Sequence, residues 1–364
     1  MDTAREKGNV VAFLGPKASY THQATLQKFG DQNFHIVPMT SIDDVFAAVQ
    51  AGSATHGVVP FENSSNGPVL FTLDLFADAD KRHPDIVVEA EIYLPVHHCL
   101  VGQRAAKALH TAKATDAPSL SQVREDLDTS PVVSGAATPT QTAPQPARPR
   151  VQPLHSIKHI QHVHSHPQAW GQCKAFLTAY LKQAEKHDVS STSRAAEIVA
   201  TDSTGVSAAV SSKLAAELNG LDVLAEGIED TQGNSTRFFV LRRRQDVEGH
   251  VNASSTEGVN GPVANAHDDQ AQLFKSLISF TVDHAEPGAL ADSLAVFKKH
   301  GLNLTSINTR PSGARPWNYV FFVELMGRKR GDGDGGKVNV ALDELGRVVK
   351  TYRWLGSWEK MTKD

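Results

Sequence analysis

A short polar stretch, residues 233–241, carries residue types that could do chemistry. A turn that begins at Gly233 delivers Thr236 and Arg237 to the start of an apolar strand, residues 238–241. A hydroxyl beside a guanidinium suits an anionic substrate that must also receive a hydrogen bond, because the planar arginine fork matches a carboxylate and lysine cannot reproduce it. The same pair is also compatible with the polar first residues of an ordinary β-strand, so other parts of the chain must decide.

Three further polar stretches lie where an expected strand runs into an expected helix. These stretches are residues 62–65, 165–172 and 191–192. Ser165 and Gln172 are seven residues apart, which is two helical turns, so both can face one cleft. The sequence shows neither the Gly-x-Ser-x-Gly elbow of a hydrolase nor a glycine-rich phosphate-binding loop. Neither of those chemistries is therefore indicated.

Histidines crowd one segment of the chain, at His159, His162, His164 and His166, and His97 and His98 form a pair. Metal ligands must share one surface and need supporting groups behind them. His162, His164 and His166 would share a strand face only if the strand continued to residue 166, where the pattern places a helix. We therefore predict solvated or hydrogen-bonded histidines and no metal site.

The composition is that of an ordinary globular protein. Of the 364 residues, 40% are hydrophobic and 21% are charged, and the net charge of −4 argues against a nucleic-acid surface. Two cysteines, Cys99 and Cys173, provide no disulfide framework and fit a reducing compartment as small core residues. Residues 1–9 are short and polar, and no run approaches the ~18 apolar residues of a membrane span. We predict a cytoplasmic protein without an anchor.

The first part of the chain alternates between apolar strands and amphipathic helices. We expect strands at 10–14, 34–37 and 57–60, and helices at 19–29, 42–49 and 69–76. Ser41 followed by Asp44 predicts a capping box. The alternation predicts a largely parallel sheet, and open sheets of this kind bind ligands beyond the carboxyl ends of their strands. Asn63 and Ser64 follow the third strand and fall at such a place.

The middle of the chain contains a compositional break. Residues 86–101 are expected to be extended and to cross into a second lobe, whereas residues 113–153 are rich in Pro, Ala, Thr, Ser and Gln and predict a disordered insertion. A fourfold longer surface loop costs only about 1 kcal/mol in closure entropy, so the fold can carry it. Ser165 and Gln168 then predict a capping box for a helix that runs to about residue 183.

The rest of the second lobe is expected to contain helices at 194–201 and 213–219 and strands at 205–210 and 221–225. Residues 244–270 are polar and predict a linker. Beyond it, strands are expected at 277–282, 302–309, 318–325 and 354–358, and helices at 289–300 and 338–352. This order of strand, helix, strand, strand, helix and strand is ferredoxin-like, and such small sheets often pair across a dimer.

Taken together, the motifs resemble those of the prephenate dehydratases. The matching stretches, in the family's order, are Gly15-Pro16-Lys17-Ala18-Ser19-Tyr20, Pro60-Phe61-Glu62-Asn63-Ser64 with Gly67, Ser165-His166-Pro167-Gln168-Ala169 with Gln172, Ser191-Thr192, and Asn234-Ser235-Thr236-Arg237-Phe238. The tail resembles an ACT domain, with Glu286-Pro287-Gly288-Ala289-Leu290, Asn303-Leu304-Thr305 and Arg310-Pro311. The resemblance covers about residues 10–102, 160–243 and 272–358.

The resemblance implies an α/β fold with a regulatory tail. A two-lobed catalytic domain like a periplasmic binding protein, residues 9–243, would precede the linker and a ferredoxin-like ACT domain, residues 271–358. The implied reaction converts prephenate to phenylpyruvate without metal or cofactor. Thr236 would hydrogen-bond the departing hydroxide, Glu62 could hold its proton, and Arg237 would clamp the side-chain carboxylate. The residues expected to orient the substrate are Asn63, Ser64, Ser165, Gln172, Ser191, Thr192 and Phe238.

Regulation is implied by the ACT-like tail. Phenylalanine, the pathway end product, is expected to bind between paired ACT domains of a homodimer or homotetramer and to inhibit by favouring one of two arrangements. The expected contacts are Glu286, Pro287, Gly288, Ala289, Leu290, Asn303, Leu304 and Thr305. The chain departs from the family at Ala18, where Gly is usual, in the insertion after Gly102, and at Asn308-Thr309, where Glu-Ser is usual. The last departure leaves the choice between phenylalanine and tyrosine open.

Two alternatives remain for the function. Arogenate dehydratase performs the same chemistry on a substrate with an amino group in place of the side-chain keto group, and the absence of a transit-like N-terminal segment disfavours a plastid enzyme of that kind. A catalytically inactive binding protein with an amino-acid-sensing tail is of another class. The intact Thr236-Arg237-Phe238 stretch argues against that second alternative.

Overall fold

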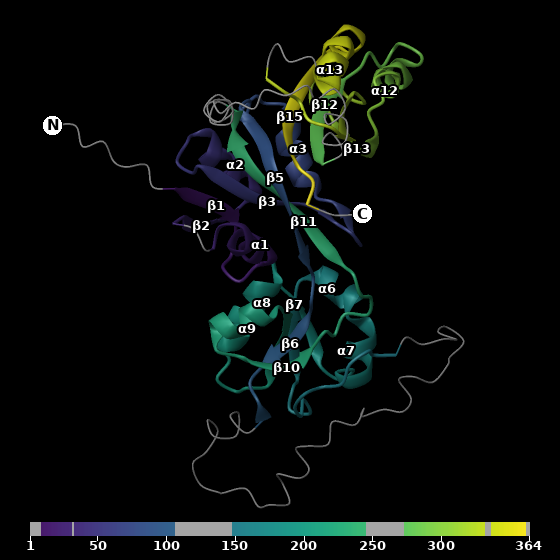
Figure 1. Ribbon diagram of the computed structural model, residues 1–364. Coiled ribbons are helices and arrows are strands. Elements are labelled where there is room, and N and C mark those ends of the chain that lie inside the picture. Colours follow the sequence, from purple (N-terminus) through teal and green to yellow (C-terminus); the bar gives the residue numbers. More distant parts are fainter. Residues whose placement is uncertain (1–8, 31–32, 106–147, 245–272, 332–335, 362–364) are drawn as a thin grey trace, which may run out of the picture. The chain divides into compact units, whose positions relative to one another are not determined.

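The structure is a computed structural model of the chain (Figure 1). It describes residues 9–30, 33–105, 148–244, 273–331 and 336–361. Most of the predicted insertion and of the predicted linker lies outside these residues. The chain divides into two compact units, which we call unit 1 and unit 2. Unit 1 consists of Met1–Leu14, Ala24–Leu94 and Thr236–Asp364, and unit 2 of Gly15–Gln23 and Pro95–Ser235.

The first part of unit 1 is the predicted parallel sheet with its helices. Strands β1 (Val10–Leu14), β2 (His35–Met39) and β3 (His56–Asn63) are parallel, and β4 (Gly67–Pro68) returns against β3. Strand β11 (Ser235–Arg243) runs antiparallel to β3, and β5 (Ile86–Pro95) lies beside β11. Helices α2 (Ile42–Gln50) and α3 (Leu70–Ala77) belong to this part, while α1 (Tyr20–Phe29) crosses the division between the units.

Local sequence explains these elements. The Ser41 hydroxyl accepts a hydrogen bond from the Asp44 N–H at 3.1 Å, and the Asp44 carboxylate accepts one from the Ser41 N–H at 2.9 Å, which is the predicted capping box. Helix α2 then buries Val45, Phe46 and Val49. Each fully buried side chain of this size contributes roughly 1.5–3 kcal/mol of hydrophobic stabilisation.

The C-terminal part of unit 1 is ferredoxin-like, as predicted. Its elements are β12 (Phe274–Thr281), α12 (Ala289–Lys299), β13 (Leu304–Pro311), β14 (Tyr319–Met326), α13 (Lys337–Val348) and β15 (Thr351–Glu359). The sheet order is β13-β14-β12-β15, and β12 is antiparallel to both of its neighbours. The last helix ends at Val348, four residues before the predicted end, because Val349 is extended and the Lys350 N–H donates to the Thr281 carbonyl at 2.8 Å.

The two sheets of unit 1 join at a glycine. Gly356 of β15 pairs with Val88 of β5 in parallel orientation. A Cβ at Gly356 would lie 2.1 Å from the Val88 carbonyl oxygen, and φ at Gly356 is +130°. Only glycine permits this approach, so the ferredoxin-like sheet continues directly into the sheet that carries β11.

Unit 2 is built on a second sheet in the order β10-β6-β9-β7-β8. Its strands are β6 (Cys99–Gly102), β7 (His162–Ser165), β8 (Glu185–Asp188), β9 (Ser207–Ser211) and β10 (Asp222–Glu226). Its helices are α6 (Pro167–Gln172), α7 (Lys174–Tyr180), α8 (Thr192–Ala200) and α9 (Lys213–Asn219). Strands β8 and β9 are parallel to β7, and β6 is antiparallel to β9 and β10. Cys99 and Cys173 are buried and unpaired core residues, as predicted.

Two sequence predictions for unit 2 are wrong. The residue that caps α6 is His166 rather than Ser165, since the His166 side chain accepts from the Gln168 N–H. The helix that begins there also breaks at Cys173 instead of running to residue 183. Asp230 accounts for the break, because its N–H donates to the Gln172 carbonyl at 2.7 Å and its carboxylate accepts from the Ala175 N–H at 3.0 Å. Both orphan groups at the break are thereby satisfied.

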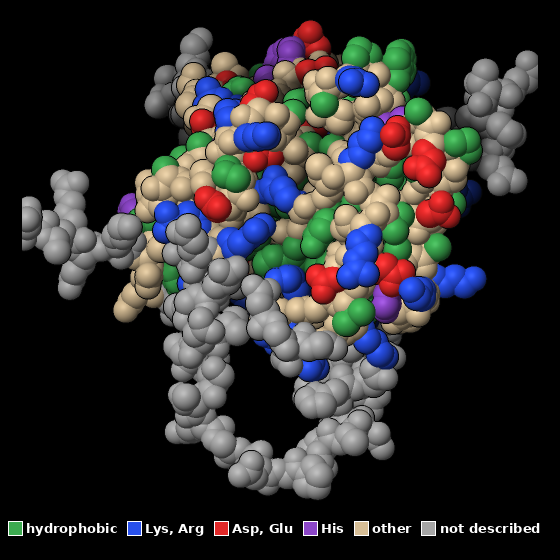
Figure 2. Space-filling model, turned by 90° about the horizontal axis from the view of Figure 1, so that it is seen from above, with side chains coloured by type: hydrophobic (Ala, Val, Ile, Leu, Met, Phe, Trp, Pro, Cys, Tyr) green, Lys and Arg blue, Asp and Glu red, His purple; other side chains and the backbone are tan. Residues whose placement is uncertain are grey.

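The surface and the helices agree with the composition. Basic and acidic side chains are interspersed on the face shown in Figure 2, as a small net charge would suggest. Among the described residues, none of the helices has both the length and the apolar character that crossing a membrane requires.

Candidate active site

The hydroxyl of Thr236 lies against the amide of Asn63. Strand β11 pairs with β3 so that Thr236 stands opposite Asn63 and Arg237 opposite Glu62. The Asn63 Nδ2 donates to the Thr236 Oγ1 at 3.0 Å. Because Asn63 is the donor in this bond, the Thr236 hydroxyl keeps its own proton for an acceptor elsewhere. The pairing therefore joins two of the four candidate stretches.

The orientation of the Asn63 amide is fixed by the turn that follows β3. Its Oδ1 accepts hydrogen bonds from the N–H groups of Ser65 and Asn66, each at 3.0 Å. This Asx-type turn occupies the amide oxygen, so the amide nitrogen must face Thr236. Gly67 has φ +78°, which allows the chain to return as β4. Ser64, at the tip of the turn, is exposed.

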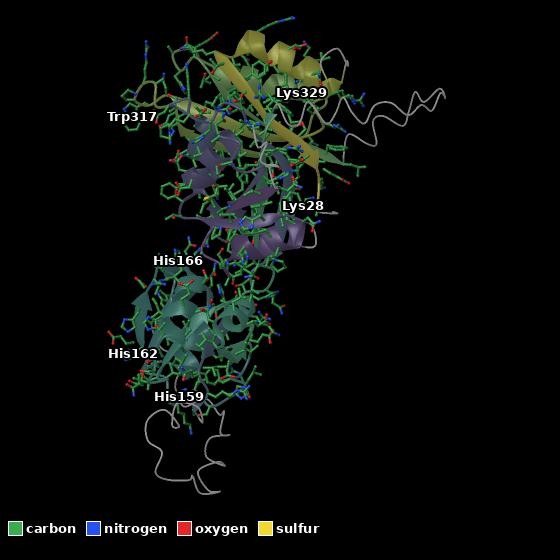
Figure 3. The ribbon with its side chains drawn as sticks, turned by 90° about the vertical axis from the view of Figure 1, so that its left-hand side faces the viewer. Lys28, His159, His162, His166, Trp317 and Lys329 are labelled. Carbon is green, nitrogen blue, oxygen red and sulfur yellow. The ribbon has the colours of Figure 1, made fainter. Side chains whose placement is uncertain are left out.

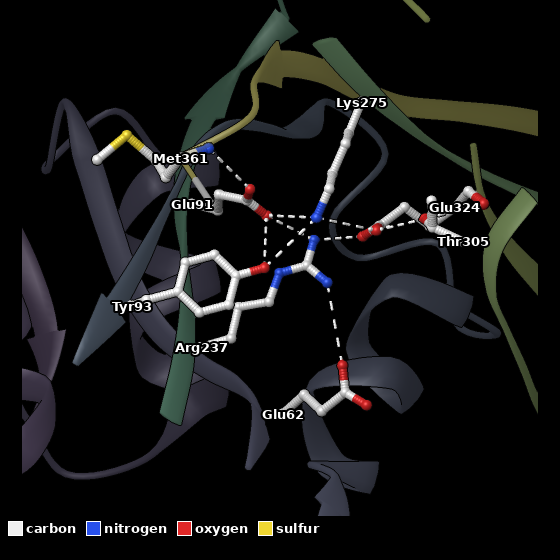
Figure 4. A network of polar contacts seen from close by, with 8 residues as sticks. All are labelled: Glu62, Glu91, Tyr93, Arg237, Lys275, Thr305, Glu324 and Met361. Atoms are coloured by element: carbon white, nitrogen blue, oxygen red, sulfur yellow. Dashed lines mark hydrogen bonds and ion pairs between the residues drawn. The ribbon is translucent and has the colours of Figure 1, made fainter. Parts of the chain in front are cut away.

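Arg237 projects from the other face of β11 and is buried, with only 6% of its surface exposed. Its guanidinium is hydrogen-bonded to Glu324 of β14 and lies 2.8 Å from the Glu91 carboxylate of β5. The guanidinium carbon is 4.9 Å from the centre of the Phe239 ring. Lys275 of β12 lies 3.4 Å from both Glu91 and Glu324, which completes a buried cluster of two cations and two carboxylates (Figure 4).

Opposite charges in this cluster counteract the effect of burial on Glu324 and Arg237. Burial alone would raise the pKa of Glu324, but the positive charges of Arg237 and Lys275 outweigh it and lower that pKa. Burial alone would lower the pKa of Arg237, but Glu324 and Glu91 raise it. The Arg237 fork is thus engaged by protein carboxylates, and its predicted role as a clamp for substrate stays a prediction.

Glu62 lies on the same side as Arg237. Its carboxylate is 3.9 Å from the Arg237 guanidinium and half-exposed. Because neighbouring residues of a strand alternate between faces, this position does not bring the Glu62 carboxylate to the Thr236 hydroxyl. Phe238 is buried, at the β-bulge that follows Arg237. The roles of Glu62 as proton source and of Phe238 as substrate contact stay predictions.

In unit 2, the predicted residues Ser165, Ser191 and Thr192 gather at one edge of the sheet. Strands β7, β8 and β9 are parallel, so the end of β7 at Ser165 and the segment after β8 lie at the same edge. Ser165 is fully buried, and its hydroxyl donates to the Val210 carbonyl at 2.8 Å. Ser191 caps α8 by accepting from the Arg194 N–H at 3.1 Å. The Thr192 carbonyl accepts from the Ser211 hydroxyl at 2.8 Å.

Gln172 leads to two residues that sequence reasoning did not select. Its amide oxygen accepts a hydrogen bond from the Nε2 of His98 at 2.6 Å. His98 is buried, which lowers its pKa, and its other ring nitrogen lies 3.4 Å from the Tyr20 hydroxyl. The signal for both residues was present in the sequence, since Tyr20 ends a family-like stretch and His98 belongs to the histidine pair. Ala18, in the same stretch, has φ +65°, a conformation that the family's usual glycine adopts without strain.

The chain is similar to known proteins over most of its length. A model of the family described as prephenate dehydratase matches residues 11–143 and 150–246. The bifunctional chorismate mutase/prephenate dehydratase of Aquifex aeolicus is 34% identical over 355 residues, which cover 98% of this chain and 75% of that protein. The probable prephenate dehydratase of Saccharomyces cerevisiae is 32% identical over 352 residues, which cover 88% of this chain and 87% of that protein.

The chain belongs to the prephenate dehydratase family. Prephenate dehydratases are hydro-lyases of phenylalanine biosynthesis, so the chain is an enzyme of that class. A crystal structure of prephenate dehydratase in complex with L-Phe from Arthrobacter aurescens has a similar fold, with a TM-score of 0.68 and 24% identity over 96% of this chain and 90% of that one. The predicted fold, with a ferredoxin-like C-terminal part, is confirmed.

The two stretches expected to bind the effector lie at opposite ends of α12. Glu286, Pro287 and Gly288 precede the helix, while Asn303 follows it. Eleven helical residues separate them, a length of about 16 Å. One copy of the chain therefore does not bring the stretches together. Ala289 and Leu290 start α12, Leu304 and Thr305 start β13, and the Thr305 hydroxyl donates to the Glu324 carboxylate at 2.7 Å.

Proposed function

We propose that this chain converts prephenate to phenylpyruvate, carbon dioxide and water, with the Thr236 hydroxyl as the hydrogen-bond donor to the departing hydroxide. The observation that carries this assignment is the bond from Asn63 Nδ2 to Thr236 Oγ1. A hydroxyl whose oxygen accepts a hydrogen bond becomes a better donor through its own proton. Family membership supplies the reaction, and the locked Asn63 amide supports the choice of the donor.

The chemistry requires little beyond this donor. The bond between the ring and its carboxylate breaks and releases carbon dioxide, and the electron pair of that bond moves through the ring diene. The bond to the ring hydroxyl breaks as the ring becomes aromatic, and the departing hydroxide takes up one proton to become water. Because aromatisation takes up the electron pair, no cofactor or metal is required as an electron sink. A free threonine hydroxyl is a poor acid near neutral pH, so Thr236 acts by stabilising developing negative charge, a contribution of the oxyanion-hole type.

The remaining predicted contacts complete the proposal. The family resemblance gives one role, orientation of the ring and its substituents, to Asn63, Ser64, Ser165, Gln172, Ser191 and Thr192. Ser165 and Gln172 are already bonded to protein partners, so they would act by holding the shape of their surroundings. The buried free thiols of Cys99 and Cys173 suit a reducing compartment, and we propose the cytoplasm as the location.

Phenylalanine is the proposed inhibitor, bound between the ferredoxin-like parts of two copies. The separation of residues 286–290 from residues 303–305 along α12 supports a second copy as the source of one half of the site. Strand β13 is the edge of the described sheet and exposes Ile307 at 50% of its surface, which favours association through this strand.

One assay tests the reaction. Purified full-length protein is given prephenate or arogenate in parallel, and phenylpyruvate and phenylalanine are measured as the respective products. Turnover of prephenate at the higher kcat/KM is expected. A preference for arogenate would reassign the substrate, and no turnover of either compound would favour the inactive binding protein. Size-exclusion chromatography with light scattering should show a dimer or tetramer, and a monomer would contradict the shared effector site.

A further inference from the structure

The cluster around Arg237 connects the strand of the proposed active site to the ferredoxin-like part. Arg237 lies on β11 and Glu91 on β5, whereas Lys275 lies on β12 and Glu324 on β14. The exposed fractions of these four side chains are 7%, 0%, 8% and 2%. Two positive and two negative charges are therefore held out of water in balance, and moving one of them leaves another buried charge without its partner.

Glu324 is the member of the cluster that contacts both Arg237 of β11 and Thr305 of β13. One carboxylate oxygen accepts from Arg237, the residue that follows Thr236. The other accepts from the hydroxyl of Thr305 at 2.7 Å and lies 3.4 Å from Lys275. Thr305 belongs to the stretch proposed to bind the effector. A single carboxylate thus lies between that stretch and the strand that carries the proposed catalytic hydroxyl.

Arg237 also has a second carboxylate within reach. Glu62 lies 3.9 Å from the other guanidinium nitrogen and is half-exposed, so it can follow the guanidinium if the bond to Glu324 weakens. Glu62 precedes Asn63, the donor to Thr236. A shift of Arg237 from Glu324 toward Glu62 would therefore act on both residues of the Asn63–Thr236 pair through their immediate neighbours.

We propose that Glu324 is a positioning residue that transmits effector binding to the active site. In this proposal, which rests on the proposed function, Arg237 paired with Glu324 holds Thr236 in register with Asn63. Effector bound at residues 303–305 takes the Thr305 hydroxyl away from Glu324, and the Glu324 carboxylate is then free to turn away from Arg237. In one state Arg237 is paired with Glu324, and in the other it has shifted toward Glu62. The effector binds these two states with different affinity, as regulation requires.

The test uses a charge-balanced double variant of the full-length enzyme, Lys275→Met with Glu324→Gln. It removes one charge of each sign, so Arg237 and Glu91 remain paired and folding is protected. The measured quantity is the coupling, defined as kcat/KM for prephenate without phenylalanine divided by kcat/KM at saturating phenylalanine. For the wild type we expect a coupling of about 5–150. For the double variant we expect at least a threefold smaller coupling, with the phenylalanine Kd from calorimetry within about threefold of the wild-type value.

Glu89→Gln is the matched control. It breaks the 2.8 Å pair between Arg242, also on β11, and Glu89 of β5 without touching the ferredoxin-like part. The control should keep the wild-type coupling. An unchanged coupling in the double variant, or an equal loss in the control, would overturn the role of Glu324. Absence of prephenate turnover in the wild type would refute the proposed reaction, and turnover that phenylalanine does not affect would refute the effector and the transmission together.

A separate cluster in unit 2 supports a second proposal. Strands β7 and β8 pair with His162 opposite Glu185 and His164 opposite His187, so all four side chains share one face of the sheet. His162 Nδ1 lies 3.2 Å from His187 Nε2 and 3.5 Å from the Glu185 carboxylate, which is 3.7 Å from His187 Nε2. Figure 3 shows His162 at the outside of unit 2. The sequence alone did not place these histidines on one surface, as a metal site requires, but the pairing of β7 with β8 does.

These distances match the spacing of ligands around zinc. Bonds of about 2.0–2.2 Å in a tetrahedron place neighbouring ligand atoms about 3.3–3.6 Å apart. We infer that His162, His187 and Glu185 bind Zn²⁺ with a fourth position open to water. Since β8 is the edge strand and contains only polar residues, an ion shared between β7 and β8 would fasten this edge to the sheet.

Titration of the full-length protein with ZnCl₂ by calorimetry tests the zinc site. One site per chain is expected, at least tenfold weaker in His187→Gln and unchanged in His35→Gln, which removes an exposed histidine of β2. Zinc should also raise the Tm of the wild type and of the control but not of His187→Gln. Equal zinc affinity in His187→Gln and the wild type would overturn the site and leave a hydrogen bond between the two imidazoles as the explanation of their contact.

Discussion

Thr236 and Arg237 are consecutive residues of β11, yet they belong to two different regions. Thr236 is half-buried and meets the amide of Asn63 at the end of β3. Arg237 is buried among Glu91, Glu324 and aromatic rings. One face of the strand offers a proton donor, and the other holds an ionic cluster that reaches into the ferredoxin-like part. A motif that appears as one functional pair in the sequence is divided by the alternation of the strand.

The two faces should respond differently to mutation. On the Thr236 face, a substitution removes a hydrogen bond that stabilises the negative charge developing on the departing hydroxide in the transition state. On the Arg237 face, a substitution leaves a buried charge uncompensated in the folded protein at all times. Activity and stability therefore separate the faces, and each prediction below tests one side of this difference.

The largest effect is expected from Arg237→Gln. Removing the guanidinium leaves Glu324 and Glu91 with Lys275 alone, and breaking a buried pair of this kind costs about 3–5 kcal/mol of unfolding free energy. Urea unfolding measures this loss. Arg242→Gln, which removes a more exposed ion pair of the same strand, should cost less than about 1 kcal/mol.

Arg237→Lys decides between the two interpretations of this residue. A substrate clamp would raise KM and leave unfolding unchanged, because lysine cannot reproduce the fork. A buried cluster instead predicts a lower midpoint of urea unfolding with KM nearly unchanged. If the variant has normal stability and a raised KM, Arg237 binds the substrate carboxylate.

Thr236→Val is expected to have the next largest effect. The substitution keeps the shape and removes the hydroxyl, so kcat should fall at least ~10²-fold, about 2.7 kcal/mol, with KM little changed. Thr236→Ser keeps the hydroxyl and should retain most of the activity. Steady-state kinetics with prephenate measures both variants. Near-normal turnover in Thr236→Val would remove Thr236 from the mechanism.

Asn63→Asp tests the donor behind Thr236. The aspartate can still accept from the Ser65 and Asn66 N–H groups, but it replaces the Nδ2 donor by an acceptor. The Thr236 proton would then be attracted to the protein instead of the substrate. We expect kcat to fall about tenfold, the equivalent of a net hydrogen bond of ~1.4 kcal/mol, with little change in unfolding. Unchanged kcat would show that the Asn63–Thr236 bond has no part in the reaction.

Much of the fold could be predicted because its signals are local. The capping box of Ser41 and Asp44, the apolar strands 10–14 and 238–241 and the order of the ferredoxin-like elements depend on residues close together in the chain. Strand β8 was missed because Glu-Lys-His-Asp carries no apolar residue, and an edge strand needs none. The break at Cys173 depends on Asp230, which is distant in sequence.

The candidate site shows the same limit more clearly. The contact between Asn63 and Thr236 joins residues 173 positions apart, and that between Arg237 and Glu324 spans 87 positions. The family resemblance brought the first pair together, but nothing local to Arg237 identifies a carboxylate in the C-terminal part as its partner. One signal in the sequence was usable: adjacent residues of a strand face opposite sides, so Thr236 and Arg237 could be expected on different faces.

The smallest expected effect concerns pH. The pKa of Glu324 is lowered in the folded protein: burial opposes the shift, but the charges of Arg237 and Lys275 outweigh it. Its stabilising contribution is therefore complete above the ordinary unfolded value, about 4.3, and is lost as the pH falls below that value through the folded pKa. The Lys275→Met, Glu324→Gln variant lacks this carboxylate, so its unfolding free energy should fall less steeply than that of the wild type from pH 5 to pH 3.

The control for this pH comparison is again Glu89→Gln, because Glu89 also has a lowered pKa. Burial opposes that shift as well, and His56 and Arg242 outweigh it. In Glu89→Gln, the fall of the unfolding free energy between pH 5 and pH 3 should be less steep than in the wild type by the contribution of Glu89 alone. When Glu89→Gln is combined with the double variant, the two changes in slope should add, since the two carboxylates share no partner. Groups common to all variants, such as the buried His98, cancel in the differences. Identical acid unfolding of the wild type and the double variant would mean that Glu324 gains nothing from its ionised state in the fold, and the distinction between the two faces of β11 would lose its electrostatic basis.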